Sequence, residues 1–178
     1  MFNEYLQSND KNIIYCCLFE ISKIIEYIES IKDDGSQFND ILFDSLLNLV
    51  FTSSNLNIQF ESSQCVIMLT KLSDSYCKRI VKSSNIFLKL YNLVFETNDN
   101  IISNNLLTII FNILESRVIE IEEVFKLIPD FFTSVVKKPI EDQNYPLMMM
   151  TTIISIFKSV INDLDFDQYD VIITINYI

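Results

Sequence analysis

Apolar residues recur every three or four positions along most of the chain, which is the spacing of one face of an α-helix. The first such segment runs from Ile14 through Ile24 to Ile28 and ends near Gly35, a residue suited to a left-handed helix cap. Short polar runs rich in Ser, Thr, Asn and Asp separate it from similar segments. These segments lie at 41–50, 58–72, 76–94, 102–113, 121–135 and 146–161. Their apolar stripes are wide, so each predicted helix is covered on more than one side.

An internal repeat indicates how these helices are arranged. Asn48-Leu49-Val50-Phe51 recurs 44 residues later as Asn92-Leu93-Val94-Phe95, and each copy is followed by a polar turn and an apolar helix. In the second helix of each copy, Ile58 matches Ile101. A period of roughly 40–47 residues is typical of HEAT and armadillo repeats. The sequence therefore predicts an all-α protein, an α-solenoid of about four antiparallel helical hairpins, with a compact helical bundle as the alternative.

The predicted domain organisation is a helical-repeat domain at residues 1–164 followed by a C-terminal tail at 165–178. Pro129 falls inside the predicted helix 121–135, so that helix is kinked there or a new one begins. From Tyr169 to Ile178 the helical period is lost, and the tail is strand-like or disordered.

The composition argues against most catalytic chemistry. The chain has one glycine, which excludes a glycine-rich phosphate loop, and no histidine, the usual general base and the commonest zinc ligand. No Cys-x-x-Cys spacing occurs, so the four cysteines are expected to be small buried apolar residues. Asp163, Asp165 and Asp167 resemble the start of a calcium loop, but Gln168 and Thr174 stand where that loop needs glycine and glutamate. We predict no catalytic, cofactor-binding or metal-binding residue and no cofactor, and we expect that the protein is not an enzyme.

Charge identifies one candidate binding surface. The net charge is −11, so the chain is expected to repel nucleic acid. Against this background, basic residues gather between positions 71 and 89 with a single acid, Asp74, among them. The basic residues are Lys71, Lys78, Arg79, Lys82 and Lys89. This group is predicted to bind an acidic partner surface or membrane headgroups, or else to form a solvated face that balances nearby acids.

The segment from Ser53 to Leu114 resembles the N-terminal trunk of coatomer and clathrin-adaptor large subunits, the coatomer β subunits most closely. The resemblance is carried by a serine-rich turn with its following helix, by an Ile-Lys helix, and by a polar turn that opens another helix. These residues are Ser53–Ser63 with Leu69-Thr70-Lys71-Leu72-Ser73, then Ile80-Val81-Lys82, then Glu96-Thr97-Asn98-Asp99-Asn100-Ile101. The resemblance implies a scaffold of a Golgi vesicle coat that binds other coat subunits and a small GTPase. It carries over no individual binding residue.

The sequence thus predicts a protein-binding scaffold in the cytoplasm, associated with Golgi vesicles in its coat-like version. Its uncharged stretches are shorter than the roughly 18–20 residues that span a bilayer, so membrane association is expected only as a peripheral contact through partners. Two alternatives remain open. One is another solenoid role, such as a transport receptor or a phosphatase scaffold. The other is a compact bundle, like the viral Bcl-2 proteins, that sequesters a partner's helix in a groove.

Overall fold

The computed structural model divides the chain into two units, Met1–Asp142 and Gln143–Ile178. Residues 2–32, 38–119 and 121–128 are described, and all belong to the first unit. The predicted helix at 146–161, the tail at 165–178 and the domain boundary at 164 lie outside the described residues, as do Pro129 and the calcium-loop-like aspartates.

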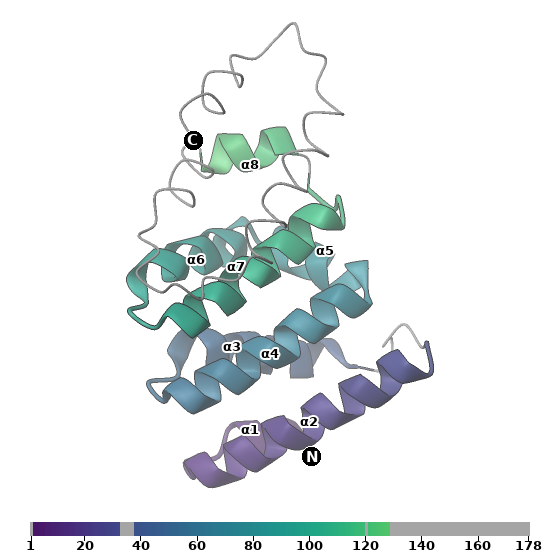
Figure 1. Ribbon diagram of the computed structural model, residues 1–178, viewed down its shortest axis with the longest axis vertical. Helices are drawn as coiled ribbons and strands as arrows, with labels where there is room; N and C mark the ends of the chain where they lie inside the picture. Colours follow the sequence, from purple (N-terminus) through teal and green to yellow (C-terminus); the bar gives the residue numbers. More distant parts are fainter. Residues whose placement is uncertain (1, 33–37, 120, 129–178) are drawn as a thin grey trace, which may run out of the picture. The chain divides into compact units, whose positions relative to one another are not determined.

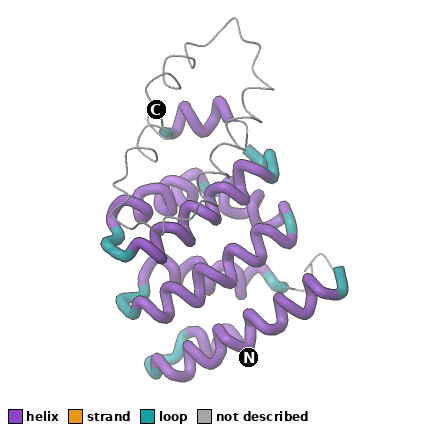
Figure 2. The backbone as a smooth tube through the Cα atoms, viewed as in Figure 1, coloured by secondary structure: helices purple, strands orange, loops and turns teal. Residues whose placement is uncertain are grey.

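The described part of the chain is helical and contains no strand, so the predicted all-α class is confirmed there (Figure 2). In chain order the helices are α1 (Phe2–Leu6), α2 (Lys11–Ser30), α3 (Asp40–Thr52), α4 (Leu56–Leu72), α5 (Asp74–Lys82), α6 (Ser84–Glu96), α7 (Asn100–Glu115) and α8 (Ile121–Leu127). The short helix α1 was not among the predicted elements, because five residues give too little periodicity to detect.

One capping motif begins three of these helices, α2, α4 and α7. It consists of a hydroxyl residue, any residue, and an Asp or Asn that caps the helix. The three copies are Ser8 to Asp10, Ser53 to Asn55 and Thr97 to Asp99. In each, the hydroxyl oxygen accepts a hydrogen bond from the N–H of the capping residue, at 3.1, 3.2 and 3.2 Å. The capping side chain in turn accepts from the first turn of the helix.

Two of the copies share a further hydrogen bond between consecutive helices. The buried Gln59 amide of α4 donates to the Val50 carbonyl of α3 at 2.8 Å, and the buried Ser103 hydroxyl of α7 donates to the Val94 carbonyl of α6 at 3.2 Å. Both donors and both acceptors are 44 residues apart. In this register Ile58 matches Ile102, which is buried like Ile58, and not Ile101, which is 60% exposed. The pairing of Ile58 with Ile101 expected from the sequence is therefore wrong by one residue.

The helices that follow the repeated cap pack in succession: α4 lies against α2 on one side and against α7 on the other. In Figure 1 these three helices run across the front of the unit, and the hydrogen bonds between them join residues in increasing order, so they run parallel. α3 packs on α1 and α4, and α6 packs on α7. The core between them is apolar, with Phe43, Phe87 and Leu18 among its largest fully buried side chains.

The single helix predicted at 76–94 is two helices, α5 and α6, which meet at Ser83. Ser83 has an extended backbone (φ −108°, ψ 95°) and is both the end of α5 and the N-cap of α6. Serine favours caps over helix interiors, because its hydroxyl competes for backbone hydrogen bonds. The break lets α5 contact α4, α6 and α7 while Phe87, Leu90 and Val94 of α6 remain buried.

Candidate functional site

Arg79, the centre of the predicted basic group, is engaged inside the unit. Its guanidinium donates to both carboxylate oxygens of Asp44 at 2.9 and 2.6 Å and lies 2.7 Å from Asp40. The hydrogen bond to Asp44 raises the pKa of Arg79 above its usual value. Arg79 therefore ties α5 to α3, which is a structural role that the sequence spacing did not reveal.

The other four basic residues lie on α4, α5 and α6 in different surroundings. The Lys89 ammonium lies 4.4 Å from the centre of the Phe51 ring, a cation–π contact between α6 and α3. The Lys71 ammonium is 3.8 Å from a carboxylate oxygen of Glu29, with both side chains exposed. Lys78 and Lys82 are exposed on α5 and form no ion pair with any described residue. Binding of an acidic partner by this group remains a prediction, for which Lys78 and Lys82 are the best placed.

Three of the four cysteines are buried as expected, and Cys16 is exposed, which corrects the expectation for that residue. Burial raises the pKa of the Cys17 and Cys77 thiols to about 11 and that of Cys65 to about 12. These three therefore stay protonated and poorly nucleophilic near neutral pH. Within the described residues, no group of three Cys, Asp or Glu side chains is placed to hold a metal ion.

An exposed apolar stripe runs along α2 to its C-cap, Ile31, and we call it the α2 face. Its members are Ile13, Cys16, Ile24, Tyr27 and Ile31, all exposed, with Glu20 among them. The exposed fractions of Ile13, Ile24, Tyr27 and Ile31 are 42%, 37%, 64% and 54%. Spacings of three, four and seven residues place this stripe on one side of the helix. Exposed apolar stripes of this kind mark interaction sites more often than inert surface.

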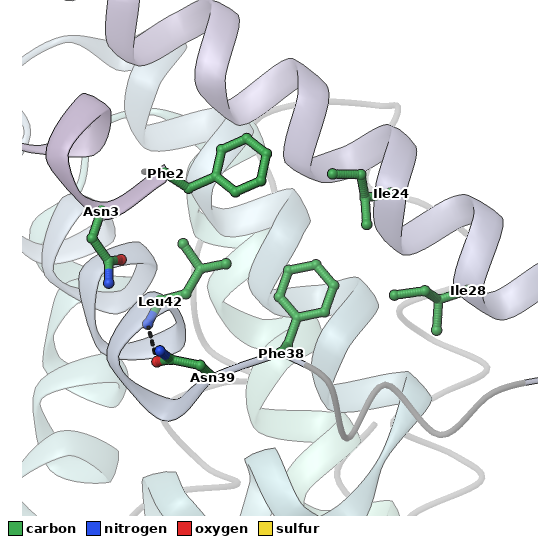
Figure 3. A pocket seen from close by; sticks show the side chains of 7 residues that line it. All are labelled: Phe2, Asn3, Ile24, Ile28, Phe38, Asn39 and Leu42. Atoms are coloured by element: carbon green, nitrogen blue, oxygen red, sulfur yellow. Dashed lines mark hydrogen bonds between the residues drawn. The ribbon is translucent and has the colours of Figure 1, made fainter.

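Two pockets border the α2 face, and Phe2 lines both. One, of about 330 Å³, is open to solvent and is lined by residues of α1, of α2 and of the segment Phe38–Leu42 at the start of α3. Figure 3 shows Ile24 and Ile28 reaching toward it from α2, with Phe2, Phe38 and Leu42 opposite. The second, of about 380 Å³, lies between α1 and α2 and is lined by Tyr5, Ile13, Cys16, Cys17 and Glu20, among others. Both pockets therefore adjoin the apolar stripe on the side of α1.

The apolar spacing does not single out this surface, and it places Ile24 in the predicted buried stripe of the first segment. Ile24 is 37% exposed, whereas Ile14, Ile21, Ile25 and Ile28 are buried. The available signal was that the apolar residues of α2 occupy two adjoining stripes and not one. Periodicity alone does not tell which of two stripes has a neighbour.

Comparisons with protein-family models, with curated proteins and with solved structures found no match to this chain. The candidate site is thus defined by its own geometry. Among the described helices, none is long and apolar enough to cross a membrane.

Proposed function

We propose that this chain is a non-catalytic scaffold that binds other proteins, built as a helical-repeat solenoid of the HEAT/armadillo type. The observation that carries the proposal is the α2 face, an exposed apolar stripe continued by two pockets. Binding of a partner that covers such a stripe is favourable, because each Å² of apolar surface removed from water stabilises the complex by about 25 cal/mol.

Three features support the solenoid arrangement. The capping motif recurs before α2, α4 and α7, and the buried hydrogen bond to the preceding helix recurs 44 residues later. In addition, α4 packs on α2 and on α7, so a repeated unit contacts the unit before it and the unit after it. Stacking of this kind, in which each unit buries its apolar faces against neighbours, is the basis of repeat proteins. Among the described helices, it leaves α2 with one face that no repeated unit covers.

The test of the proposed function uses the full chain as bait, followed by reconstitution with purified proteins. Candidate partners are enriched from the source cells, produced recombinantly and titrated by isothermal calorimetry. We expect at least one partner to bind with defined stoichiometry and a negative heat-capacity change, the mark of apolar burial. Absence of any partner that survives reconstitution contradicts the proposal.

The coat-like version of this role is a narrower proposal that rests on the resemblance between Ser53 and Leu114. In the structure, several of the resembling residues have structural roles: Ser53, Asn55, Thr97 and Asp99 form two of the helix caps. Its test is direct binding to purified coatomer subunits and to their small GTPase. Binding to neither, with another partner bound in reconstitution, removes the coat role and keeps the scaffold.

A further inference from the structure

The α2 face occupies positions that are core positions in the two later copies of the repeat. Counted from the capping residue, the third and fourteenth positions are Ile13 and Ile24 in α2. The same positions in the later copies are Ile58 and Leu69 in α4, and Ile102 and Ile113 in α7. These four residues are at most 3% exposed, whereas Ile13 and Ile24 are 42% and 37% exposed. The α2 face therefore consists of positions that are buried between helices in the two later copies.

In the later copies, this interface faces the preceding helix of the succession. The Cys65 thiol, at the tenth position of α4, lies 3.7 Å from the Leu18 carbonyl oxygen of α2. On α7, the Asn105 amide donates to the Ser63 hydroxyl of α4 at 2.7 Å, and the Asn112 amide donates to the Ile67 carbonyl at 3.1 Å. What fits this face in the later copies is thus an α-helix that runs parallel to the one it covers.

Charge distinguishes the α2 face from its counterparts. Its tenth position is Glu20, where α4 has Cys65 and α7 has Ile109, both fully buried. Glu20 lines the pocket between α1 and α2, and none of the described basic side chains pairs with it. A helix that covered this face would take the Glu20 carboxylate out of water. Burying a carboxylate in this way is unfavourable unless the helix supplies a positive charge at the same level.

We infer that the α2 face binds an amphipathic α-helix of a partner protein, which runs parallel to α2 and places a Lys or Arg opposite Glu20. The partner helix carries apolar residues at spacings of three and four, which cover Ile13 and Ile24 and reach the pocket beside Phe2. This inference rests on the proposed scaffold function and names the surface and the chemistry of its ligand. Helix-in-groove recognition with a charged register contact is a common mode of protein binding.

A second copy of this chain is a poorer occupant of the same face. In a two-fold symmetric contact, only the residues on the axis meet their own copies. Glu20 lies near the middle of the stripe that runs from Ile13 to Ile31, so two Glu20 carboxylates would approach each other there. Like charges in a desolvated contact are unfavourable. Lys23, the basic residue of α2 nearest to Glu20 in sequence, already pairs with Glu26 at 2.7 Å.

The test selects helices on the purified full chain and on its charge-reversed variant. A yeast-displayed library of amphipathic peptides of 20 residues, the length of α2, is sorted against the wild type and against Glu20→Lys. The matched control is Glu96→Lys, which makes the same charge reversal at an exposed residue at the end of α6. We expect the wild type and the control to enrich peptides with Lys or Arg inside the apolar stripe, and Glu20→Lys to enrich peptides with Asp or Glu there.

The enriched peptides are then titrated against Ile13→Asp and against the control Leu56→Asp, which alters a residue 53% exposed at the start of α4. Ile13→Asp is chosen because an acid in the first turn of α2 is compatible with the helix dipole, and circular dichroism verifies that both variants fold. We expect affinity to fall about tenfold or more in Ile13→Asp and to change little in Leu56→Asp. Bound peptide should also slow alkylation of the exposed Cys16. A nitroxide attached to one end of the peptide shows whether the peptide runs parallel or antiparallel to α2.

Several outcomes overturn the inference and are distinguishable. If the wild type and Glu20→Lys enrich the same peptides, the proposed charge contact with Glu20 is wrong. If the bound peptide runs antiparallel to α2, the proposed parallel geometry is wrong. Binding that survives Ile13→Asp places the ligand elsewhere and leaves the scaffold function intact. A wild-type dimer in analytical ultracentrifugation that Ile13→Asp dissociates shows that a second copy is the occupant. If no peptide and no reconstituted partner binds, the inference and the proposed function fail together.

Discussion

At the residue scale, the side-chain oxygens of Asp10, Asn55 and Asp99 fix where α2, α4 and α7 begin. Asp10 accepts one hydrogen bond, and Asn55 and Asp99 two each, from N–H groups of the first turn that have no partner within the helix. Capping residues of this type stabilise a helix by roughly 0.5–2 kcal/mol relative to alanine.

Replacing Asp99 by Ala is expected to lower the free energy of unfolding by about 1 kcal/mol, because the N–H groups of Ile101 and Ile102 lose their acceptor. Urea unfolding followed by circular dichroism measures the change. Asn98→Ala, at an exposed neighbour, is the control and should have a clearly smaller effect, and Asp99→Asn should recover most of the loss. Equal losses in Asp99→Ala and Asn98→Ala would contradict the capping role.

The cysteines give a second prediction at this scale. In the native protein at pH 7, a thiol reagent is expected to modify Cys16 and to spare Cys17, Cys65 and Cys77, which are buried and protonated. Peptide mapping by mass spectrometry assigns the modified residue, and the same reaction in urea shows that all four are competent. Modification of Cys17 as fast as Cys16 would show that α1 does not shield this side of α2.

The sequence was informative about some residues and not about others. Its apolar spacing predicted the buried side chains of α4 and α7 well, because these helices have neighbours on two sides. In α3 it was wrong for Ile41, which is 60% exposed, and it missed the buried Phe43 and Leu47. It did not predict that Arg79 pairs with Asp40 and Asp44, since those residues are more than 30 positions away and meet only in the fold. A cluster of like charges in a sequence is therefore a poor guide to which of them are free.

At the element scale, the break at Ser83 is what the periodicity missed. Apolar residues continue through Ile80, Phe87, Leu90 and Val94, so a pattern of three and four residues crosses the junction without interruption. The dihedral angles of Ser83 are a local property that the pattern does not encode. Both helices bury apolar residues because each is packed against α7.

Helix α6 offers a paired test of its packing. Leu90 is fully buried and Leu88 is 38% exposed on the same helix. Leu90→Ala is expected to cost about 2–5 kcal/mol of unfolding free energy, because it leaves a cavity in the core. Leu88→Ala makes the same chemical change and should cost less than about 1 kcal/mol. Chemical denaturation of both variants measures the difference, and similar losses would mean that α6 is not oriented as described.

At the scale of the whole molecule, the repeat was detectable because Asn48–Phe51 and Asn92–Phe95 are identical in sequence. The first copy was not detected, because only its cap, Ser8 to Asp10, follows the pattern and the residues before it differ. Sequence also gave no sign that the α2 face is uncovered. Ile13 and Ile24 have the same apolar character as their buried counterparts Ile58 and Leu69, and only the arrangement of neighbours distinguishes them.

We propose that the described helices form repeated units, each stabilised by its neighbours, with α2 open to a partner. The stability of a repeat array is approximately the sum of the stabilities of its units and of the interfaces between neighbouring units. A small destabilising substitution in one unit therefore lowers the stability of that unit more than that of distant ones. Ile21 and Ile110 hold the same position in their copies of the repeat, and both are fully buried. Replacing either by valine costs about 0.5–1.5 kcal/mol, small enough to keep the chain folded.

Hydrogen exchange with mass spectrometry, compared among the wild type, Ile21→Val and Ile110→Val, distinguishes stacked repeats from a single cooperative bundle. We predict that Ile21→Val speeds amide exchange mainly in α1 and α2 and leaves α7 unchanged, and that Ile110→Val does so mainly in α6 and α7. A uniform increase across α2, α4 and α7 in both variants would show one cooperative bundle and contradict the stacked-repeat account.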